Sequence, residues 1–383
     1  MIIGVPREIA SGERRVALIP DSVRRLVEKG LEVHVETGAG VESGALDTDY
    51  EKAGAHLEAD PRALFARADV LTRVQPPDSH PRAGAHEVEL LREGSCLIAL
   101  LQPFDHLDMV KNLASRRITS FALDLMPRIT RAQSTDVLSS MSTVSGYKAA
   151  LMAASALPKI FPMLMTAAGT LKPARVLVLG AGVAGLQAIA TARRLGAVVE
   201  AFDIRSATKE QIKSLGARFV EEEGTAEDAE DASGYAKEQT QEQLDRQREL
   251  LAKHIALADA VICTALVPGR RAPILVTEEQ VKGMRPGSVV IDLAAEQGGN
   301  CELTEPGQVR SVHNVEIHGP QNVPSTVPVH ASQMFSRNMT NYLLHLIQDG
   351  ALKLDLEDEL TKGPLVTHAG EVVHEAVRAA LEA

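Results

Sequence analysis

Residues Gly180-Ala181-Gly182-Val183-Ala184-Gly185 form a complete G-x-G-x-x-G motif, the glycine pattern that binds the diphosphate of a dinucleotide. The motif directly follows an apolar run at 175–179, typical of a buried strand, and opens a helical stretch at 183–195. Gly180 permits the tight turn, Gly182 lets the backbone approach a diphosphate, and Gly185 lets helix and strand pack closely. The helix N-terminus adds unpaired N–H groups. The motif in this context predicts a dinucleotide site.

An acidic residue at the end of the next apolar run indicates which dinucleotide is bound. Asp203 follows the run at 198–202 and lies 23 residues after Gly180 (203 − 180), close to the spacing of about 20 in dinucleotide folds. A carboxylate there accepts hydrogen bonds from a ribose diol and repels a 2′-phosphate, which favours NAD(H). Arg205 leaves NADP(H) as an alternative, because a nearby arginine can hold a 2′-phosphate.

Other chemistries find little support in the residue pattern. The 12 histidines show no HExxH or paired metal-ligand spacing, and neither a GxSxG nor a GxxxxGK[ST] motif occurs, so we expect no metal centre and no nucleophilic triad. Cys96, Cys263 and Cys301 are far apart, and the chain opens without a secretory pattern, which together favour a reducing cytoplasm. The formal charge of −11 argues against binding to nucleic acid or to an anionic membrane.

The elements that must position these residues follow a β-α-β rhythm. With 383 residues, two domains are expected. Apolar runs alternate with helical stretches in the N-terminal third and again around the glycine motif, which predicts an α/β fold of two Rossmann-like domains with parallel sheets, joined by long helices. The second of these is the dinucleotide-binding fold. We predict an N-terminal domain of residues 1–137 plus 329–383, completed by C-terminal helices, and a nucleotide-binding domain of residues 138–328.

Two further segments bear on organisation. Residues 149–171 are apolar, but Pro158, Lys159 and Pro162 lie at their centre, so we expect a buried, kinked helix in place of a membrane span. Residues 221–249 are acidic and polar with one aromatic residue, Tyr235, which is typical of a solvated loop or of a mobile functional one.

Two stretches are specific enough to indicate a family. Residues 126–140, MPRITRAQSTDVLSS, resemble the signature loop of the NAD(H)-binding component of proton-translocating nicotinamide nucleotide transhydrogenase. Residues 289–301, VVIDLAAEQGGNC, resemble the same component and, in a related form, alanine dehydrogenases; the segments at 4–8 and 13–18 are shared by both. The resemblance extends over essentially the whole chain.

The resemblance implies the site residues and the partners. In the signature loop, the residues implied to contact the nucleotide near its nicotinamide are Arg128, Gln133, Asp136 and Ser139. A mobile loop that closes over NAD(H) maps to Gly234-Tyr235, and the other implied contacts are Val183, Ile204, Gln247 and Leu266, beside Asp203 and Arg205. The family implies a homodimer with membrane-spanning and NADP(H)-binding partner subunits, peripheral on the cytoplasmic side of the inner membrane. One chain with one glycine motif holds only NAD(H), so hydride would pass directly to or from NADP(H) on a partner.

Two alternatives stay open. Alanine dehydrogenase chemistry needs groups that bind a carboxylate and manage protons. Where that family has a Lys, a His and an Asp, this sequence has Gln75, Leu101 and Glu296, although Arg15 is retained. A non-catalytic subunit that binds NAD(H) and responds to it is the second alternative.

Overall fold

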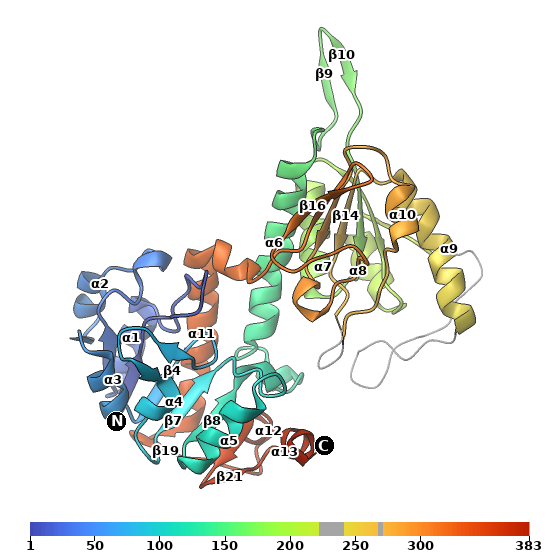
Figure 1. Cartoon of the computed structure of the whole chain (residues 1–383). Coiled ribbons are helices and arrows are strands. Elements are labelled where there is room, and N and C mark those ends of the chain that lie inside the picture. Colours follow the sequence, from blue (N-terminus) through green and yellow to red (C-terminus); the bar gives the residue numbers. More distant parts are fainter. Residues whose placement is uncertain (222–240, 267–270, 383) are drawn as a thin grey trace. The chain divides into compact units, whose positions relative to one another are not determined.

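The computed structural model describes residues 1–221, 241–266 and 271–382, with side chains left out at 241–245. The chain forms two compact units, one of residues 1–141 together with 325–383 and one of residues 142–324 (Figure 1). Both units are α/β, as the alternation of apolar runs and helical stretches predicts. Unit 1 is discontinuous in sequence because the C-terminal segment returns to it.

Unit 1 is built on an eight-stranded sheet of order β21-β20-β8-β7-β4-β1-β2-β3. Its six N-terminal strands are parallel, whereas β20 is antiparallel to β8 and β21 is antiparallel to β20. The C-terminal segment therefore contributes two strands in addition to the expected helices. The strands are β1 (Ile2–Val5), β2 (Glu32–Glu36), β3 (His56–Glu58), β4 (Val70–Thr72), β7 (Cys96–Ala99), β8 (Thr119–Ala122), β20 (Leu365–His368) and β21 (Glu371–Val372), and the helices are α1 (Pro20–Glu28), α2 (Asp47–Lys52), α3 (Pro61–Arg67), α4 (Glu87–Leu90), α5 (Leu107–Ser115), α11 (Pro328–Leu346), α12 (Glu359–Lys362) and α13 (Glu375–Glu382).

Unit 2 contains a seven-stranded sheet of order β13-β12-β11-β14-β15-β17-β16, parallel except for its last strand. Counted from β11, the parallel strands run 3-2-1-4-5-6, the order of a dinucleotide-binding fold, so the strand order reverses between β11 and β14. The strands are β11 (Arg175–Leu179), β12 (Val198–Phe202), β13 (Arg218–Phe219), β14 (Ala260–Cys263), β15 (Val289–Asp292), β16 (Val309–Val312) and β17 (Val315–His318), and the helices include α7 (Val183–Arg194), α8 (Thr208–Ser214), α9 (Gln241–Leu257) and α10 (Glu278–Lys282).

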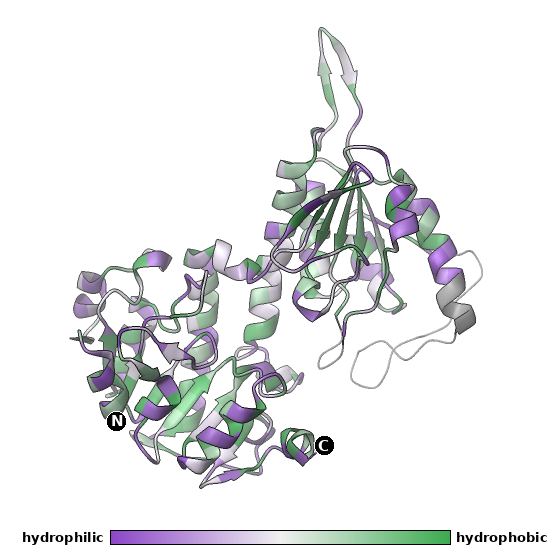
Figure 2. Cartoon of the chain, viewed as in Figure 1, coloured by the Kyte–Doolittle hydropathy of each residue, from purple (hydrophilic) through white to green (hydrophobic). Residues whose placement is uncertain are grey.

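The sheet of unit 2 is buried on both faces, which explains the uninterrupted apolar strands in its sequence. Alternate residues of β11 enter opposite cores: Val176 and Val178 pack with α6 (Val137–Ala156) and α7, whereas Leu177 and Leu179 pack with α9 and α10. Figure 2 shows the hydrophobic colour gathered on these strands and on the inward sides of the helices. Packing on both faces fixes the carboxyl ends of the strands, where the glycine motif lies.

The structure corrects the expectation for residues 149–171. Helix α6 ends before Pro158, since proline disfavours helix at the residue before it and lacks an N–H of its own. The chain then forms an exposed antiparallel hairpin of β9 (Leu164–Thr166) and β10 (Gly169–Leu171), turned by Gly169 at φ +118°, which projects from unit 2 (Figure 1). The predicted kinked, buried helix is therefore wrong beyond Ala156. Within the described ranges, no helix is long and apolar enough to cross a bilayer.

Candidate functional site

The glycine motif forms the turn between β11 and α7, and its three glycines meet three different surroundings. Gly180 has φ +94°, and a Cβ there would lie 2.8 Å from Oγ1 of Thr264 on the turn after β14. A Cβ on Gly185 would lie 1.9 Å from the carbonyl oxygen of Gly180, whereas one on Gly182 would meet no atom within 4 Å. Gly180 and Gly185 are thus required by packing, while Gly182 faces open space.

Helix α7 begins in a way that leaves donors for an anion. Gly182 is its N-cap and provides no side-chain hydrogen bond. The first N–H groups of a helix have no acceptor within the helix, and the helix dipole adds partial positive charge there. The open space at Gly182 and these unpaired N–H groups suit a diphosphate.

Asp203 directly follows β12 and is buried, and its carboxylate ties the glycine loop to the strand end. Oδ2 accepts a hydrogen bond from the backbone N–H of Ala181 at 2.7 Å. Arg205 supplies the remaining donors: its backbone N–H and Nε donate to Oδ1, both at 2.9 Å, and Nη2 donates to Oδ2 at 2.8 Å. A carboxylate offers about four lone-pair positions. Each oxygen of Asp203 therefore has two donors in this arrangement.

The opposite side of the strand reversal is fixed by buried polar side chains. Thr264 Oγ1 donates to the carbonyl of Gly180 at 3.0 Å, and Asn300 exchanges hydrogen bonds with the backbone of Ala265 at 3.0 and 2.8 Å. Asp292, at the end of β15, accepts from the N–H groups of Asn300 and Cys301 at 2.8 and 2.9 Å. Burial raises the pKa of Asp292, and these hydrogen bonds only partly oppose the rise. The 289–301 motif thus shapes the turns beside the glycine loop.

A close helix contact also supports this loop. A Cβ on Gly146 of α6 would lie 2.0 Å from the carbonyl oxygen of Ala184, in the first turn of α7. Only glycine allows the two backbones to approach in this way. The sequence does not reveal the role of Gly146, because a lone glycine in a helical run gives no signal of what it contacts.

The remaining unit 2 residues implied by the resemblance fall into three groups. Val183 and Leu266 are apolar but 41% and 43% exposed, and they lie just after Gly182 and Ala265 respectively, so they offer apolar surface next to the glycine loop. Ile204 packs against the core, and the Oε1 atom of Gln247 is buried without a hydrogen-bond partner among the described residues. Gly234 and Tyr235 lie outside the described residues.

The signature loop lies in unit 1 and leads into α6. Asp136 caps this helix: its Oδ1 accepts from the N–H of Ser139 at 2.9 Å and its Oδ2 from Ser139 Oγ at 2.6 Å. Arg128 and Gln133 are exposed. The structure therefore brings Asp136 and Ser139 into direct contact and leaves the side chains of Arg128 and Gln133 at the surface of the loop.

Residues that sequence reasoning missed hold this loop in place. Asn338 of α11 donates from Nδ2 to the carbonyl of Ser134 at 2.9 Å and accepts at Oδ1 from Ser140 Oγ at 2.7 Å. Arg131 donates from Nη2 to both oxygens of Asp358, at 3.0 and 2.9 Å. A backbone hydrogen bond at the start of α12 lowers the pKa of Asp358, and the ion pair with Arg131 adds to the effect. Their partners lie more than 190 residues away, so no local pattern reveals them.

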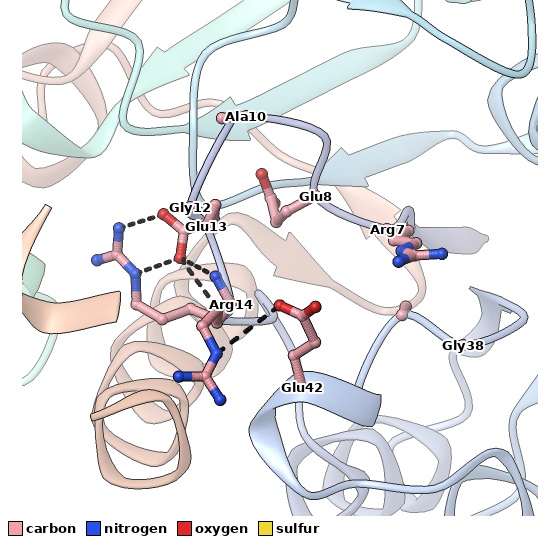
Figure 3. A pocket seen from close by; sticks show the side chains of 10 residues that line it. Arg7, Glu8, Ala10, Gly12, Glu13, Arg14, Gly38 and Glu42 are labelled. Atoms are coloured by element: carbon pink, nitrogen blue, oxygen red, sulfur yellow. Dashed lines mark hydrogen bonds and ion pairs between the residues drawn. The ribbon is translucent and has the colours of Figure 1, made fainter. Parts of the chain in front are cut away.

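A separate cavity of about 370 Å³ opens in unit 1 (Figure 3). It contains no residue of the glycine loop. Arg14 and Glu42 form an ion pair across it at 3.9 Å, which Figure 3 marks with a dashed line. The residues that line it are Arg7, Glu8, Ala10, Gly12, Glu13, Arg14, Arg15, Gly38, Ala39 and Glu42.

Arg15, which the sequence shares with alanine dehydrogenases, is committed to an internal carboxylate. Its Nε and Nη2 donate to the two oxygens of Glu13 at 2.7 and 2.6 Å, with both side chains buried. Gln75 Nε2 donates to the same carboxylate at 2.7 Å. Burial alone would raise the pKa of Glu13, but the hydrogen bonds and charge of Arg15, with the amide of Gln75, bring it down to about 2.

Comparison with known proteins identifies the family. The family model "Alanine dehydrogenase/PNT, N-terminal domain" matches residues 4–145, and "Alanine dehydrogenase/PNT, C-terminal domain" matches residues 149–375. The chain belongs to the alanine dehydrogenase/PNT family. Within the family, it is 48% identical to an NAD(P) transhydrogenase subunit alpha chain of Rhodospirillum rubrum, over 98% of this chain and 99% of that protein.

The more distant members of the alanine dehydrogenase/PNT family rank as the residues suggest. Alanine dehydrogenase of Bacillus subtilis is 31% identical, over 98% of this chain and 94% of that protein. The crystal structure of transhydrogenase from Sinorhizobium meliloti is 42% identical with a TM-score of 0.85, covering 98% of this chain and 100% of that one. The resemblance to the transhydrogenase component and the α/β fold with parallel sheets are thus confirmed.

Proposed function

We propose that this chain is the NAD(H)-binding component of a proton-translocating NAD(P) transhydrogenase and that hydride passes directly between its NAD(H) and NADP(H) held by a separate subunit. The observation that carries the proposal is the complete glycine loop at the strand reversal between β11 and β14, in a chain 48% identical to a transhydrogenase alpha subunit. Bound NAD(H) supplies the hydride, so the protein's task is to bind the dinucleotide and orient its ring.

The carboxylate of Asp203 selects NAD(H) in this proposal. Both of its oxygens are saturated, so hydroxyl groups of a ribose gain access only where donors leave. The side chain of Arg205 is the part that can move, because the N–H groups of Ala181 and of Arg205 itself belong to the backbone. Release of Nε and Nη2 frees one acceptor position on each oxygen of Asp203, which matches a diol. A 2′-phosphate would meet the negative charge of Asp203.

The signature loop orients the nicotinamide end. Asp136 and Ser139 fix the start of α6, and the contacts from Asn338 hold the loop backbone. Their rigidity leaves Arg128 and Gln133, whose side chains are exposed, to contact the nucleotide near the reacting ring. Positioning of this kind changes the rate of hydride transfer more than the affinity for the nucleotide.

Alanine dehydrogenase is the second candidate, and the contacts of Arg15 weigh against it. A carboxylate substrate needs a free cation, but Arg15 is paired with Glu13, and the position of the family's Lys carries Gln75, which bonds to the same carboxylate. Leu101 is buried and Glu296 is exposed, so neither supplies the acid–base group that imine chemistry needs. The non-catalytic binding subunit is separated from both by whether hydride moves at all.

The proposal includes partners and a location. The chain forms a homodimer, and membrane-spanning and NADP(H)-binding subunits complete the complex on the cytoplasmic side of the inner membrane, with hydride transfer coupled to proton movement. The support is the name of the relatives, subunit alpha, since a protein named as one subunit works with others.

The test mixes the purified chain with the NADP(H)-binding subunit of a transhydrogenase and follows hydride transfer from NADH to a spectrally distinct NADP⁺ analogue. We expect turnover only when both proteins are present, and none from alanine with NAD⁺. Alanine-dependent NADH formation by the chain alone would establish the second candidate. NADH binding without hydride transfer to any partner would establish the non-catalytic one.

The role of the signature loop is tested by Gln133→Asn, which shortens the side chain and keeps the amide. We expect the rate of hydride transfer to fall at least about tenfold, while NADH affinity changes much less, because the substitution alters geometry. Gln348→Asn, at another exposed glutamine of unit 1, is the matched control. Equal losses of rate and affinity would remove Gln133 from this role.

A further inference from the structure

Three side chains of metal-ligating type meet at the edge of the sheet in unit 1, away from the glycine loop and the signature loop. Strand β3 is the edge strand, and it pairs with β2 so that His34 and His56 are direct neighbours. Paired residues on adjacent strands lie on one face of a sheet, and so does the residue two positions along the same strand. Glu32, two residues before His34, therefore shares that face with both histidines.

The distances bring the three ligand atoms into one small volume. Oε1 of Glu32 is 2.6 Å from Nε2 of His34 and 4.0 Å from Nε2 of His56, and the two imidazole rings are 5.1 Å apart. One ligand atom from each residue lies within 4.8 Å of the others, and no other trio of such residues does so in the part of the chain that the structure describes. Ligands at about 2.05 Å in a tetrahedral site are separated by about 3.3 Å. Both oxygen–nitrogen distances thus need to change by less than about 1 Å.

The surroundings allow this adjustment. The side chain of Glu32 is 47% exposed and that of His56 is 65% exposed, so both can rotate, whereas His34 is held in the sheet at 9% exposure. A buried anchor with two mobile ligands leaves the remaining coordination position open to water. A metal ion would replace the proton that His34 and Glu32 share, so binding would release a proton.

The ligand types determine the class of ion. Two imidazoles and one carboxylate are preferred by Zn²⁺ and the neighbouring divalent transition ions, whereas Mg²⁺ and Ca²⁺ prefer oxygen ligands alone. We propose that Glu32, His34 and His56 bind a divalent ion of the zinc class at the edge of the sheet in unit 1. Because the ligands come from both strands, the ion would join the edge strand β3 to β2.

The chain contains a matched pair that lacks the third ligand. Glu316 and His318 on β17 have the same spacing and the same 2.6 Å distance between Oε1 and Nε2, with exposures of 45% and 14%. The strand neighbours of His318 are Ile291 and Val309, which offer no ligand. The difference between the two places is His56, so substitution of His56 isolates the proposal.

The experiment uses the full chain without an affinity tag, freed of metal by a chelator. Zn²⁺ binding is measured by calorimetry, Co²⁺ binding by visible absorption, and thermal unfolding is followed with and without Zn²⁺. We expect one tight equivalent per chain and a higher unfolding midpoint with Zn²⁺, since an ion that binds only the folded state stabilises it. Mg²⁺ should do neither.

Variants decide the assignment. His56→Ala, at an exposed side chain that the fold does not need, should weaken Zn²⁺ binding at least about tenfold and abolish the thermal shift; Glu32→Gln should weaken it similarly. His318→Ala should match the unsubstituted protein. NADH affinity, measured in parallel, should be the same in all of them. No saturable Zn²⁺ binding, or binding that His56→Ala leaves unchanged, would overturn the proposal.

Discussion

Two glycines of the same loop, Gly182 and Gly185, should respond to alanine in opposite ways. A Cβ on Gly185 would lie 1.9 Å from the carbonyl oxygen of Gly180, and real Cβ contacts essentially never fall below 3.0 Å. Strand and helix must therefore separate by about 1 Å. Such overpacking costs about 1–3 kcal/mol, of which the better helix propensity of alanine returns about 1 kcal/mol.

Gly182→Ala should leave the free protein nearly unchanged. Gly182 has φ −73° and ψ −168°, a conformation open to alanine, and its Cβ would meet nothing within 4 Å. Fewer conformations in the unfolded chain stabilise such a variant by about 0.4–1 kcal/mol. The methyl group does, however, fill the space through which a diphosphate reaches the first turn of α7. We expect the Kd for NADH to rise at least tenfold, which is about 1.4 kcal/mol.

The assays are thermal unfolding of the free protein and NADH fluorescence, which is undisturbed here because the chain contains no tryptophan. Gly185→Ala should lower the midpoint by several degrees, at about 2–4 °C per kcal/mol for a unit of this size. Gly182→Ala should keep the midpoint and lose affinity. The reasoning is refuted if Gly182→Ala binds NADH normally, or if it destabilises the free protein as much as Gly185→Ala does.

Three further predictions concern charge and thiols. Glu13→Gln should destabilise the protein at pH 7 by about 3 kcal/mol, because the pKa of Glu13 is lowered to about 2 and stability from a lowered acid pKa is present above pH 4.5; urea unfolding should show the difference between the variant and the unsubstituted protein shrinking from pH 4.5 towards 2, and a constant difference would contradict the ion pair. Asp203→Asn should weaken NADH binding and reduce discrimination against NADPH in calorimetric titrations, and unchanged affinities for both would remove Asp203 from the site. The three cysteines are buried, and burial raises the pKa of each thiol, so thiol reagents should label none of them in the native state and all of them after unfolding; rapid labelling of the native protein would contradict this.

The sequence predicts best where the signal is local. The glycine motif, its flanking strand and helix, and Asp203 at the next strand end are placed by spacing alone, because a strand, a turn and a helix are adjacent in the chain. Residues 164–171 show the limit, since apolar composition does not distinguish a buried helix from an exposed hairpin. Pro158 is the available signal for the end of α6, but a proline within an apolar run indicates a kink as readily as an end.

Long-range contacts are the part that the sequence does not reveal. The pairing of His34 with His56 depends on the register of two strands, and the support that Asn338 gives to Ser134 crosses 204 residues. The double use of Asp203 by Ala181 and Arg205 is likewise invisible in a spacing rule, because the rule places the carboxylate and says nothing of its neighbours.

The discontinuity of unit 1 has a consequence for the order of events during synthesis. All of unit 2, residues 142–324, leaves the ribosome before β20 does, so its sheet can be completed while the chain is still growing. Strand β8, by contrast, waits for β20, whose residues begin at Leu365, and until then its outer edge has no partner. An unpaired edge readily pairs with other chains. Nascent unit 1 is therefore the half that most needs protection by a chaperone, and truncation of the last twenty residues should cause aggregation even though the nucleotide-binding unit is intact.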